Sequence, residues 1–277
     1  MALLFYNQIH KGAILNKTQL LAQNIRILII EESMRAHVGH IASALSIADI
    51  IATLYNDILR GVSPPKKQRD IFILSKGHAA LAQYCVLYLK KHISKKQLDT
   101  YCGEGSLLGV HPEHTLDNIE FSTGSLGQGL AFGIGSALGL RIKRTDNKVY
   151  VLMSDAEMNE GSVWESIMFA GHHKLSKLIA IIDNNKQQAM GKTVDILNYS
   201  SLSDSWKSFG WECETIDGHN INELKAALAK ESSEGKPRLI IANTVAGKGV
   251  SFMEGLVKWH YLPLTEDGFK KAMGELK

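Results

Sequence analysis

Two short apolar runs with a helical segment between them constrain the fold of this chain more than any other feature. Residues 149–153 and 178–182 are rich in valine, isoleucine and leucine, which is typical of strands buried on both faces. Between them, residues 163–175 carry apolar side chains at helical spacing. A strand, a helix and a second strand within about 35 residues predict a right-handed βαβ unit with parallel strands.

The rest of the chain alternates in the same way. Further strands are expected at 70–75, 211–216 and 238–245, where apolar runs recur. Helices are expected at 16–38, 47–58, 79–91, 94–101, 130–140 and 221–231, with a short one after residue 262. This alternation predicts the α/β class, with a doubly wound parallel sheet flanked by helices.

Composition narrows the class of protein. The chain has 277 residues, 45% of them hydrophobic and 21% charged, which is globular and enough for one large α/β domain or two small ones. A net charge of +3 is too mild for a nucleic-acid partner. Three scattered cysteines favour a reducing compartment. With neither a signal peptide nor an apolar run of ~20 residues, we expect a cytoplasmic protein without a membrane span.

Polar side chains follow both central strands where each strand ends. Asp155 comes after the first strand and Asn185 after the second, so both are expected at the carboxyl edge of the sheet, where α/β proteins bind ligands. One carboxylate and one amide oxygen suit Mg²⁺, which fills the rest of its shell with phosphate oxygens and water. A metal–diphosphate site is therefore one interpretation. The other is that these residues are ordinary turn formers and helix caps.

Four histidines occupy loops or strand ends, and most have a glycine or proline nearby: His40, His78, His111 and His260. A single histidine of this kind is more often structural than functional, but four over one sheet edge favour a site. Imidazole both donates and accepts near neutral pH, which suits proton movement around sugar hydroxyls. The long irregular segment 103–125 supports the same interpretation, because such loops inside compact domains are usually functional or disordered.

The helix expected at 130–140 contains three glycines, at positions 133, 135 and 139. Each costs ~1 kcal/mol relative to alanine in a helix interior. Their concentration predicts close backbone packing, with an identical helix of another subunit as one candidate neighbour.

The motifs around these residues resemble those of a known family. Asp155 is followed by Glu160-Gly161 and Trp164-Glu165, and an asparagine-bearing turn closes the unit, as in the thiamine diphosphate fingerprint. GH at 39–40, SKGH at 75–78, HPE at 111–113, TGSLGQG at 123–129 and KWH at 258–260 resemble transketolase motifs in order and spacing. From about residue 24 to its C-terminus, the chain resembles the N-terminal, diphosphate-binding subunit of a split transketolase.

The resemblance implies a fold, cofactors and residue roles. Thiamine diphosphate would bind a thiamine diphosphate-binding fold, with Mg²⁺ (or Ca²⁺ or Mn²⁺) held by Asp155, Asn185 and the carbonyl of Gln187. His78 and His260 would hold the diphosphate, and His40 and His111 would line the substrate channel and contact the donor. The remaining implied positions are Gly124, Leu126, Ala156 and Lys248 for the cofactor, and Glu160 for a proton network at a subunit interface.

This sequence departs from the family pattern at several positions. Ser154-Asp155-Ala156 stands where Gly-Asp-Gly is usual. The second glycine normally lets a backbone N–H approach phosphate, and if position 156 requires a positive φ, alanine would cost ~1 kcal/mol. Ala42 and Ser43 replace Gly-Gly, and Met190 replaces a common aspartate. These changes indicate a divergent member that keeps the expected metal ligands.

The resemblance also implies that a part of the enzyme is missing. In the family, a glutamate that activates the cofactor belongs to a pyrimidine-binding domain, and this chain ends where that domain would begin. We therefore expect 1–277 to form a single diphosphate-binding domain. It would pair with a separate C-terminal, pyrimidine-binding subunit in an α₂β₂ assembly and transfer a two-carbon ketol unit between sugars.

Three functions stay open. The first is the catalytic half-transketolase. The second is the same fold transferring a two-carbon or acyl unit to another acceptor, such as a carrier-bound one. The third is a degenerate, non-catalytic subunit, which Ser154 and Ala156 favour and the retained Asp155, Asn185 and histidines oppose. A nicotinamide dehydrogenase is disfavoured, because no G-x-G-x-x-G follows an expected strand and opens a helix.

Overall fold

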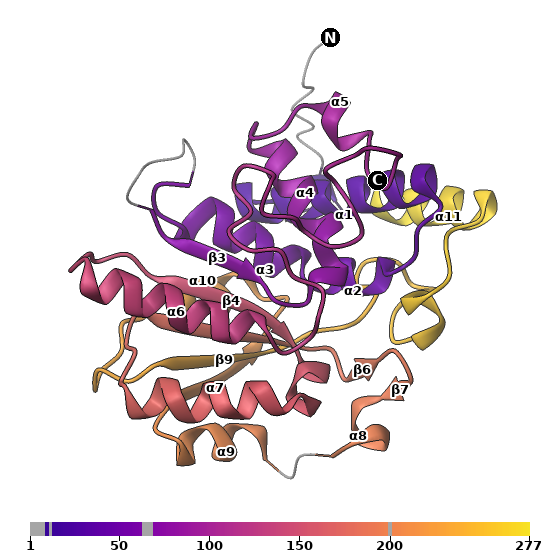
Figure 1. The fold of residues 1–277 in the computed structure, drawn as a ribbon. Helices are drawn as coiled ribbons and strands as arrows, with labels where there is room; N and C mark the ends of the chain where they lie inside the picture. Colours follow the sequence, from indigo (N-terminus) through magenta and orange to yellow (C-terminus); the bar gives the residue numbers. More distant parts are fainter. Residues whose placement is uncertain (1–8, 11–12, 63–68, 199–200) are drawn as a thin grey trace.

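A five-stranded parallel sheet lies at the centre of the computed structural model, which describes residues 9–10, 13–62, 69–198 and 201–277 (Figure 1). The strand order is β3-β4-β5-β9-β8, and every neighbouring pair is parallel. The strands are β3 (Ile71–Leu74), β4 (Val149–Ser154), β5 (Leu178–Asn184), β8 (Glu212–Asp217) and β9 (Arg238–Asn243). The predicted doubly wound sheet is confirmed, and all five expected strands belong to it.

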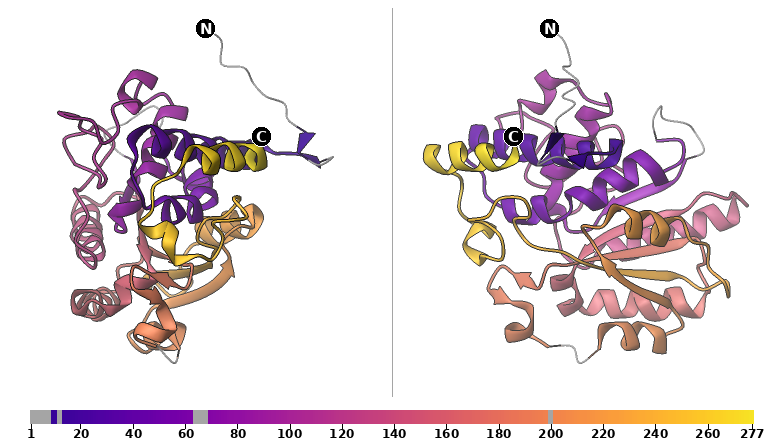
Figure 2. Two further views of the ribbon diagram at one scale, coloured as in Figure 1. Left: turned by 90° about the vertical axis from the view of Figure 1, so that its right-hand side faces the viewer. Right: turned by 180° about the vertical axis from the view of Figure 1, so that it is seen from behind.

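Helices cover both faces of the sheet (Figures 1 and 2). The hydrophobic core on one side of the sheet is shared by α1 (Lys17–Ala36), α2 (Ile41–Ser46), α3 (Ala48–Thr53), α4 (Ala80–Leu89), α10 (Ile221–Ala229) and α11 (Glu266–Leu276). The other side packs against α6 (Gly129–Ile142), α7 (Gly161–His172) and α9 (Leu202–Ser208). No helix in the described part of the chain is long and apolar enough to span a membrane.

The two layers follow from the alternation of side chains along each strand. Leu152 and Ile181 belong to the core on the α1 side, whereas Val151 and Ile182 belong to the core on the α7 side. Because successive residues of a strand point to opposite faces, a strand covered on both sides must be apolar throughout. This is why β4 and β5 were recognisable as continuous apolar runs.

Some local structure departs from the sequence-based expectation. The helix expected at 47–58 is divided into α3 and the π-helical turn η1 (Leu54–Ile58), and Ile47 (φ −97°, ψ 3°) separates α3 from α2. The helix expected at 94–101 is the single turn α5 (Lys95–Leu98). Two short antiparallel pairs were not predicted, β1 (Ile9–His10) with β2 (Ala13–Ile14) and β6 (Gln187–Gln188) with β7 (Gly191–Lys192). The second pair leads into α8 (Thr193–Ile196).

The glycines of α6 divide between two environments. A Cβ at Gly133 would collide with Val151 and lie close to Leu178, so this glycine allows α6 to approach the sheet. A Cβ at Gly135 or Gly139 would meet no atom of the described chain within 4 Å. The close packing predicted for these glycines is therefore found at Gly133. An identical helix as partner for the other two stays a prediction.

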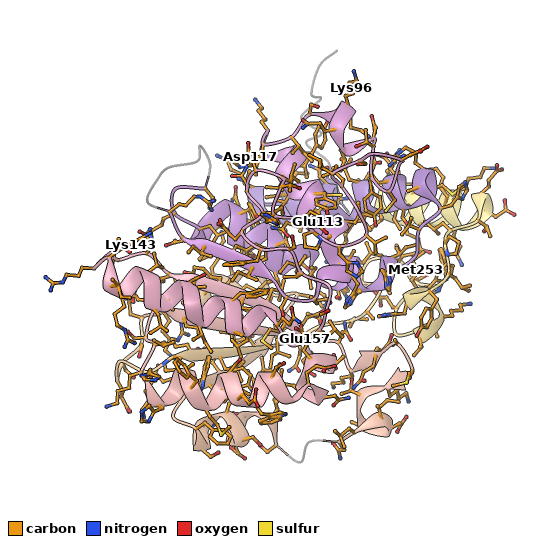
Figure 3. All side chains as sticks on the ribbon, viewed as in Figure 1. Lys96, Glu113, Asp117, Lys143, Glu157 and Met253 are labelled. Atoms are coloured by element: carbon orange, nitrogen blue, oxygen red, sulfur yellow. The ribbon has the colours of Figure 1, made fainter. Side chains whose placement is uncertain are left out.

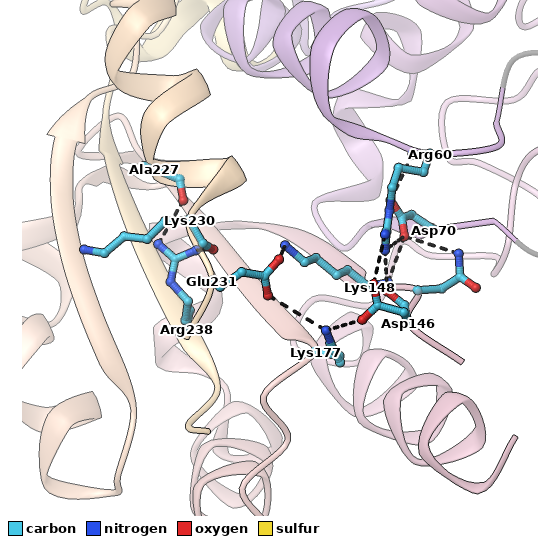
Figure 4. A network of polar contacts seen from close by, with 10 residues as sticks. Arg60, Asp70, Asp146, Lys148, Lys177, Ala227, Lys230, Glu231 and Arg238 are labelled. Carbon is cyan, nitrogen blue, oxygen red and sulfur yellow. Dashed lines mark hydrogen bonds and ion pairs between the residues drawn. The ribbon is translucent and has the colours of Figure 1, made fainter. Parts of the chain in front are cut away.

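Charged residues tie the strands together at the edge where they begin (Figure 4). Arg60 pairs with the fully buried Asp70 at 3.0 Å and with Asp146, which also pairs with Lys177 at 2.5 Å. Lys148 pairs with Glu231 at 2.6 Å. This network belongs to the edge opposite the expected site, so we assign it a structural role.

Candidate active site

A cavity of about 200 Å³ lies at the carboxyl edge of the sheet and collects most of the predicted site residues. Nine of them line it: His40, His78, His111, Gly124, Leu126, Ala156, Asn185, Gln187 and His260. The remaining lining residues are Ala42, Ser43, Lys76, Ser154, Gln188, Ala189 and Ala246. Residues from separate segments of the chain therefore meet in one place, as parallel topology requires of groups that follow strands.

Three of the histidines form a compact cluster. Ring centroids are 4.9 Å apart for His40–His260 and 5.4 Å apart for His40–His78 and His78–His260. Burial, together with the nearby Lys76 ammonium and the other rings, lowers the pKa of His78 well below its usual range and that of His260 to about 4. The pKa of His40 is lowered for the same reasons. All three imidazoles are therefore neutral at pH 7, and each ring can donate one hydrogen bond and accept another.

Close backbone approaches hold the histidines in place. The His40 backbone N–H donates to the carbonyl of His260 at 3.1 Å, and a Cβ at Gly39 would collide with the backbone of Tyr261. Gly124 (φ 154°) faces the His111 ring, which a Cβ there would meet at 3.1 Å. The glycines of the GH and TGS motifs thus have a structural reason, since larger residues would push the histidine loops apart.

The floor of the cavity contains an ion pair that the sequence analysis missed. Lys76 and Asp183 pair with each other, and both side chains are 0% exposed. Lys76 also reaches the carbonyl of Ser43 at 3.3 Å. Asp183 accepts further hydrogen bonds from Ser46, Thr244 and Asn185. The pair joins the ends of β3 and β5 to α2 beneath the histidines.

The expected metal ligands are buried and oriented. Asp155 is 3% exposed, and its carboxylate accepts from the Ala156 N–H at 3.0 Å and from the Thr193 hydroxyl at 2.7 Å. Burial, with a contribution from the Asp183 charge, raises the pKa of Asp155 to about 6 despite these hydrogen bonds. A desolvated carboxylate with no direct cationic partner among the described residues fits a site for a cation.

The asparagine completes this donor set. Asn185 lines the cavity, and its Oδ1 accepts from the Gln187 N–H at 3.0 Å. One carboxylate, one amide oxygen and one backbone carbonyl would leave half of the positions of an octahedral ion to phosphate and water. Within the described chain, no group of three or more His, Cys, Asp or Glu side chains could hold a metal. Any cation here must therefore use such a sparse set.

Position 156 tolerates its alanine. Ala156 is not among the residues with positive φ, so the Cβ adds no left-handed strain there. Ser154 is extended (φ −91°, ψ 158°), and its N–H donates to Glu157 at 2.8 Å. The conditional cost of ~1 kcal/mol considered for alanine does not arise.

Glu157 is a third residue that sequence reasoning missed. Its carboxylate is fully buried and accepts from Ser75, from the Gly127 N–H at 3.0 Å and from the Ser154 N–H. The residue is labelled among the side chains in Figure 3. Burial raises its pKa. The S-x-x-E spacing of Ser154 and Glu157 is a capping box, which was the available signal. Glu157 holds the TGSLGQG segment against the end of β4.

Three predicted residues do not line the cavity. Asp155 does not line it, although its chain neighbours Ser154 and Ala156 do; it lines a separate cavity of about 350 Å³ together with Asn184 and Thr193. Glu160 is exposed at the start of α7, where a Cβ at Gly127 would touch it. Lys248 is half-exposed with its Nζ 3.8 Å from Glu254. The roles expected for all these positions stay predictions.

Comparison with solved structures identifies the class of fold. The structure superposes on a transketolase from Campylobacter jejuni with a TM-score of 0.88 and 31% sequence identity. The match covers 94% of this chain and 42% of that chain, so this chain spans about two fifths of its length.

Sequence comparison then gives the family. Residues 17–276 match the model described as transketolase, thiamine diphosphate binding domain, and the chain belongs to the transketolase family through this domain. It is 39% identical over 260 residues to a 6-deoxy-6-sulfo-D-fructose transketolase subunit of Clostridium sp. (strain MSTE9), covering 92% of this chain and 94% of the relative. It is 37% identical over 261 residues to one of the subunits of the apulose-4-phosphate transketolase of Phocaeicola vulgatus, covering 93% of each.

Proposed function

We propose that this chain is the N-terminal subunit of a two-chain transketolase, which transfers a two-carbon ketol unit from a ketose to an aldose. The observation that carries the proposal is the meeting of His40, His78, His111 and His260 with Gly124 in one cavity at the carboxyl edge of the sheet. The family match and the near full-length similarity to proteins named as transketolase subunits support it.

The cavity would hold the diphosphate end of thiamine diphosphate, and Asp155, Asn185 and the Gln187 carbonyl would hold Mg²⁺. His78, His260, Gly124, Leu126, Ala156 and, more remotely, Lys248 are the proposed cofactor contacts. When bound, the cofactor supplies the carbanion chemistry that breaks and forms carbon–carbon bonds beside a ketose carbonyl. The buried, uncompensated Asp155 carboxylate supports the cation.

The histidines would act on the sugar. His40 Nδ1 is buried and has no hydrogen-bond partner within the described residues, so a ligand hydroxyl can satisfy it. His111 lines the same cavity against Gly124. As a neutral imidazole, His40 can orient a hydroxyl and pass its proton. We propose the same role for His111.

A second chain would supply the pyrimidine-binding part. We propose that 1–277 is a single diphosphate-binding domain and that the assembly is α₂β₂. Glu160 is exposed beside the TGSLGQG segment, which suits a residue at an interface. The α6 and α7 faces expose Ile142 (81%), Met168 (45%) and Phe169 (42%), large apolar side chains that a partner would cover. The three free cysteines suit the reducing cytoplasm as its location.

The names of the two subunit relatives bear on the donor. The two subunit relatives are named for ketoses that carry a sulfonate or a phosphate. We therefore propose a ketose with a terminal anionic group as donor, bound at that end mainly by the partner chain. A panel of phosphorylated, sulfonated and neutral ketoses, each with aldose and carrier-bound acceptors, would separate ketol transfer between sugars from transfer to a specialised acceptor.

The deciding experiment is calorimetric titration of thiamine diphosphate with Mg²⁺ into this chain co-purified with its pyrimidine-binding partner. Saturable, Mg²⁺-dependent binding that is lost in Asp155→Ala would support the cofactor site. No binding to a well-formed wild-type complex would favour a non-catalytic subunit instead. Strong loss of turnover in His111→Ala with retained cofactor binding would then support the catalytic role of that residue.

A further inference from the structure

Asp155 and Asn185, the two side chains expected to bind the cation, are each hydrogen-bonded to a residue for which the sequence motifs predicted no role. The Thr193 Oγ1 donates to Asp155 Oδ2 at 2.7 Å. The Asn185 Nδ2 donates to Asp183 Oδ2 at 3.1 Å. These contacts come from different elements, and they act on different ligands.

Thr193 is fixed by the hairpin that precedes it. It begins α8, directly after β7, and its backbone N–H donates to the Lys186 carbonyl at 3.1 Å. The residue is 9% exposed, so its hydroxyl has little access to water. The Ala156 N–H binds the other carboxylate oxygen of Asp155. Both oxygens are thus oriented, and each keeps a lone pair for a cation because a carboxylate has about four acceptor sites.

Asp183 decides which way the Asn185 amide points. A carboxylate held by an ammonium group only accepts hydrogen bonds, so the amide must turn its NH₂ toward Asp183 and its oxygen away. The oxygen then accepts from the Gln187 N–H. Asp183 itself cannot rotate freely, because Lys76, Ser46 and Thr244 bind its two oxygens. The carboxylate therefore fixes the amide in one of its two orientations.

We propose that Thr193 and Asp183 are positioning residues of a divalent-cation site, orienting Asp155 and Asn185 before the ion arrives. The inference rests on the proposed function, because it takes Asp155 and Asn185 as ligands of the cation. Residues that orient metal ligands in this way typically contribute about 10- to 100-fold to metal affinity.

The test uses Thr193→Val in the co-purified two-chain assembly. Valine keeps the branched shape and removes only the hydroxyl. With thiamine diphosphate held at saturation, the Mg²⁺ dissociation constant from calorimetry should rise about tenfold. The Mg²⁺ concentration giving half-maximal activity should rise by a similar factor, with a much smaller fall in the maximal rate. Thr193→Ser, which restores a hydroxyl, should recover most of the affinity.

Thr53→Val is the matched control. Thr53 is also buried and its hydroxyl donates to the Asp49 carbonyl at 2.8 Å inside α3, away from the cavity. Its Mg²⁺ affinity should equal that of the wild type. Asp183→Asn tests the other ligand and should also weaken Mg²⁺ binding. Should that variant not fold, the Thr193 pair of variants still decides whether Asp155 is held in position for the ion.

The outcomes separate this inference from the proposed function. Wild-type Mg²⁺ affinity in Thr193→Val, or a serine variant as weak as the valine one, would overturn the positioning role while leaving the proposed function intact. Absence of Mg²⁺-dependent cofactor binding in the wild-type assembly would overturn both. A selective loss in valine that serine restores would support both.

Discussion

Replacing Lys76 by methionine should destabilise this protein strongly, because Lys76 is fully buried. No catalytic role was predicted for this residue. The substitution shortens the side chain by one atom and removes its charge. The Asp183 carboxylate would then be a buried anion without a cation, since both side chains of the pair are 0% exposed. Breaking a buried ion pair by removing one partner typically costs about 3–5 kcal/mol.

The hydrogen bonds that remain set the expected size of the effect. Asp183 would keep its contacts with Ser46, Thr244 and Asn185, which partly stabilise the charge. We therefore expect the lower end of that range, about 3 kcal/mol. Domains are typically stable by about 5–15 kcal/mol, so Lys76→Met should fold with a reduced margin. For a chain of 277 residues the midpoint of thermal unfolding should fall by roughly 5 °C.

The measurement is urea unfolding followed by tryptophan fluorescence at pH 7.5, read as the free energy of unfolding. Lys148→Met is the matched control. Its partner Glu231 is 66% exposed, so loss of that pair should cost less than about 1 kcal/mol. The double variant Lys76→Met/Asp183→Asn removes both charges and should recover about 2 kcal/mol relative to the sum of the single variants. A cost for Lys76→Met no larger than that of the control, or strict additivity in the double variant, would refute the reasoning.

Three further predictions concern the cavity. The free energy of unfolding should be constant above pH 6.5 and fall toward pH 4.5, because His78 and His260 stay neutral in the folded protein but protonate below pH 6.5 in the unfolded chain. Urea titrations of the double variant His78→Gln/His260→Gln should show a shallower fall with decreasing pH, and a fall as steep as that of the wild type would contradict this. Ala156→Gly should change the affinity for thiamine diphosphate, measured by calorimetry, by no more than about threefold, or ~0.7 kcal/mol, because the alanine backbone is unstrained there. A tenfold gain in affinity would mean that the Cβ of Ala156 obstructs the cofactor. Gly39→Ala should weaken that affinity more than about tenfold by separating the His40 and His260 loops. Gly274→Ala, whose Cβ would meet no atom of the described chain within 4 Å on α11, should leave the affinity unchanged, and equal effects of the two variants in the same titration would rule out this explanation.

The parts of the fold that could be predicted are those whose burial produces a regular spacing of apolar residues in the sequence. Strands covered on both faces must be apolar at every position, so β4 and β5 were visible as runs, and α7 between them as a helical period. Parallel topology then brought the four histidines to one edge without knowledge of any contact. The expected helix at 47–58 was wrong in detail, because the change from the α-helix α3 to the π-helical turn η1 leaves no mark in the apolar pattern.

The parts that could not be predicted are buried charges and short hairpins. Lys76, Asp183 and Glu157 are residue types that usually lie at the surface, and only the partners that the fold supplies make their burial tolerable. Thr193 reaches Asp155 because β6 and β7 reverse the chain just before it, and no Asn-Gly or Asp-Gly signal marks that turn. These residues surround the candidate site, where local sequence rules most often fail.

The segments that close the cavity come from opposite ends of the chain, which has a consequence for synthesis. Arg26 donates to the Lys248 carbonyl and Gln23 to that of Leu276, across 222 and 253 residues, and His40 is bonded to His260. On a ribosome, α1 and the GH turn therefore emerge long before the residues that hold them. Contacts this distant are slow to form, and apolar faces stay exposed meanwhile. The histidine cluster is assembled late, when the last segment folds back over the first.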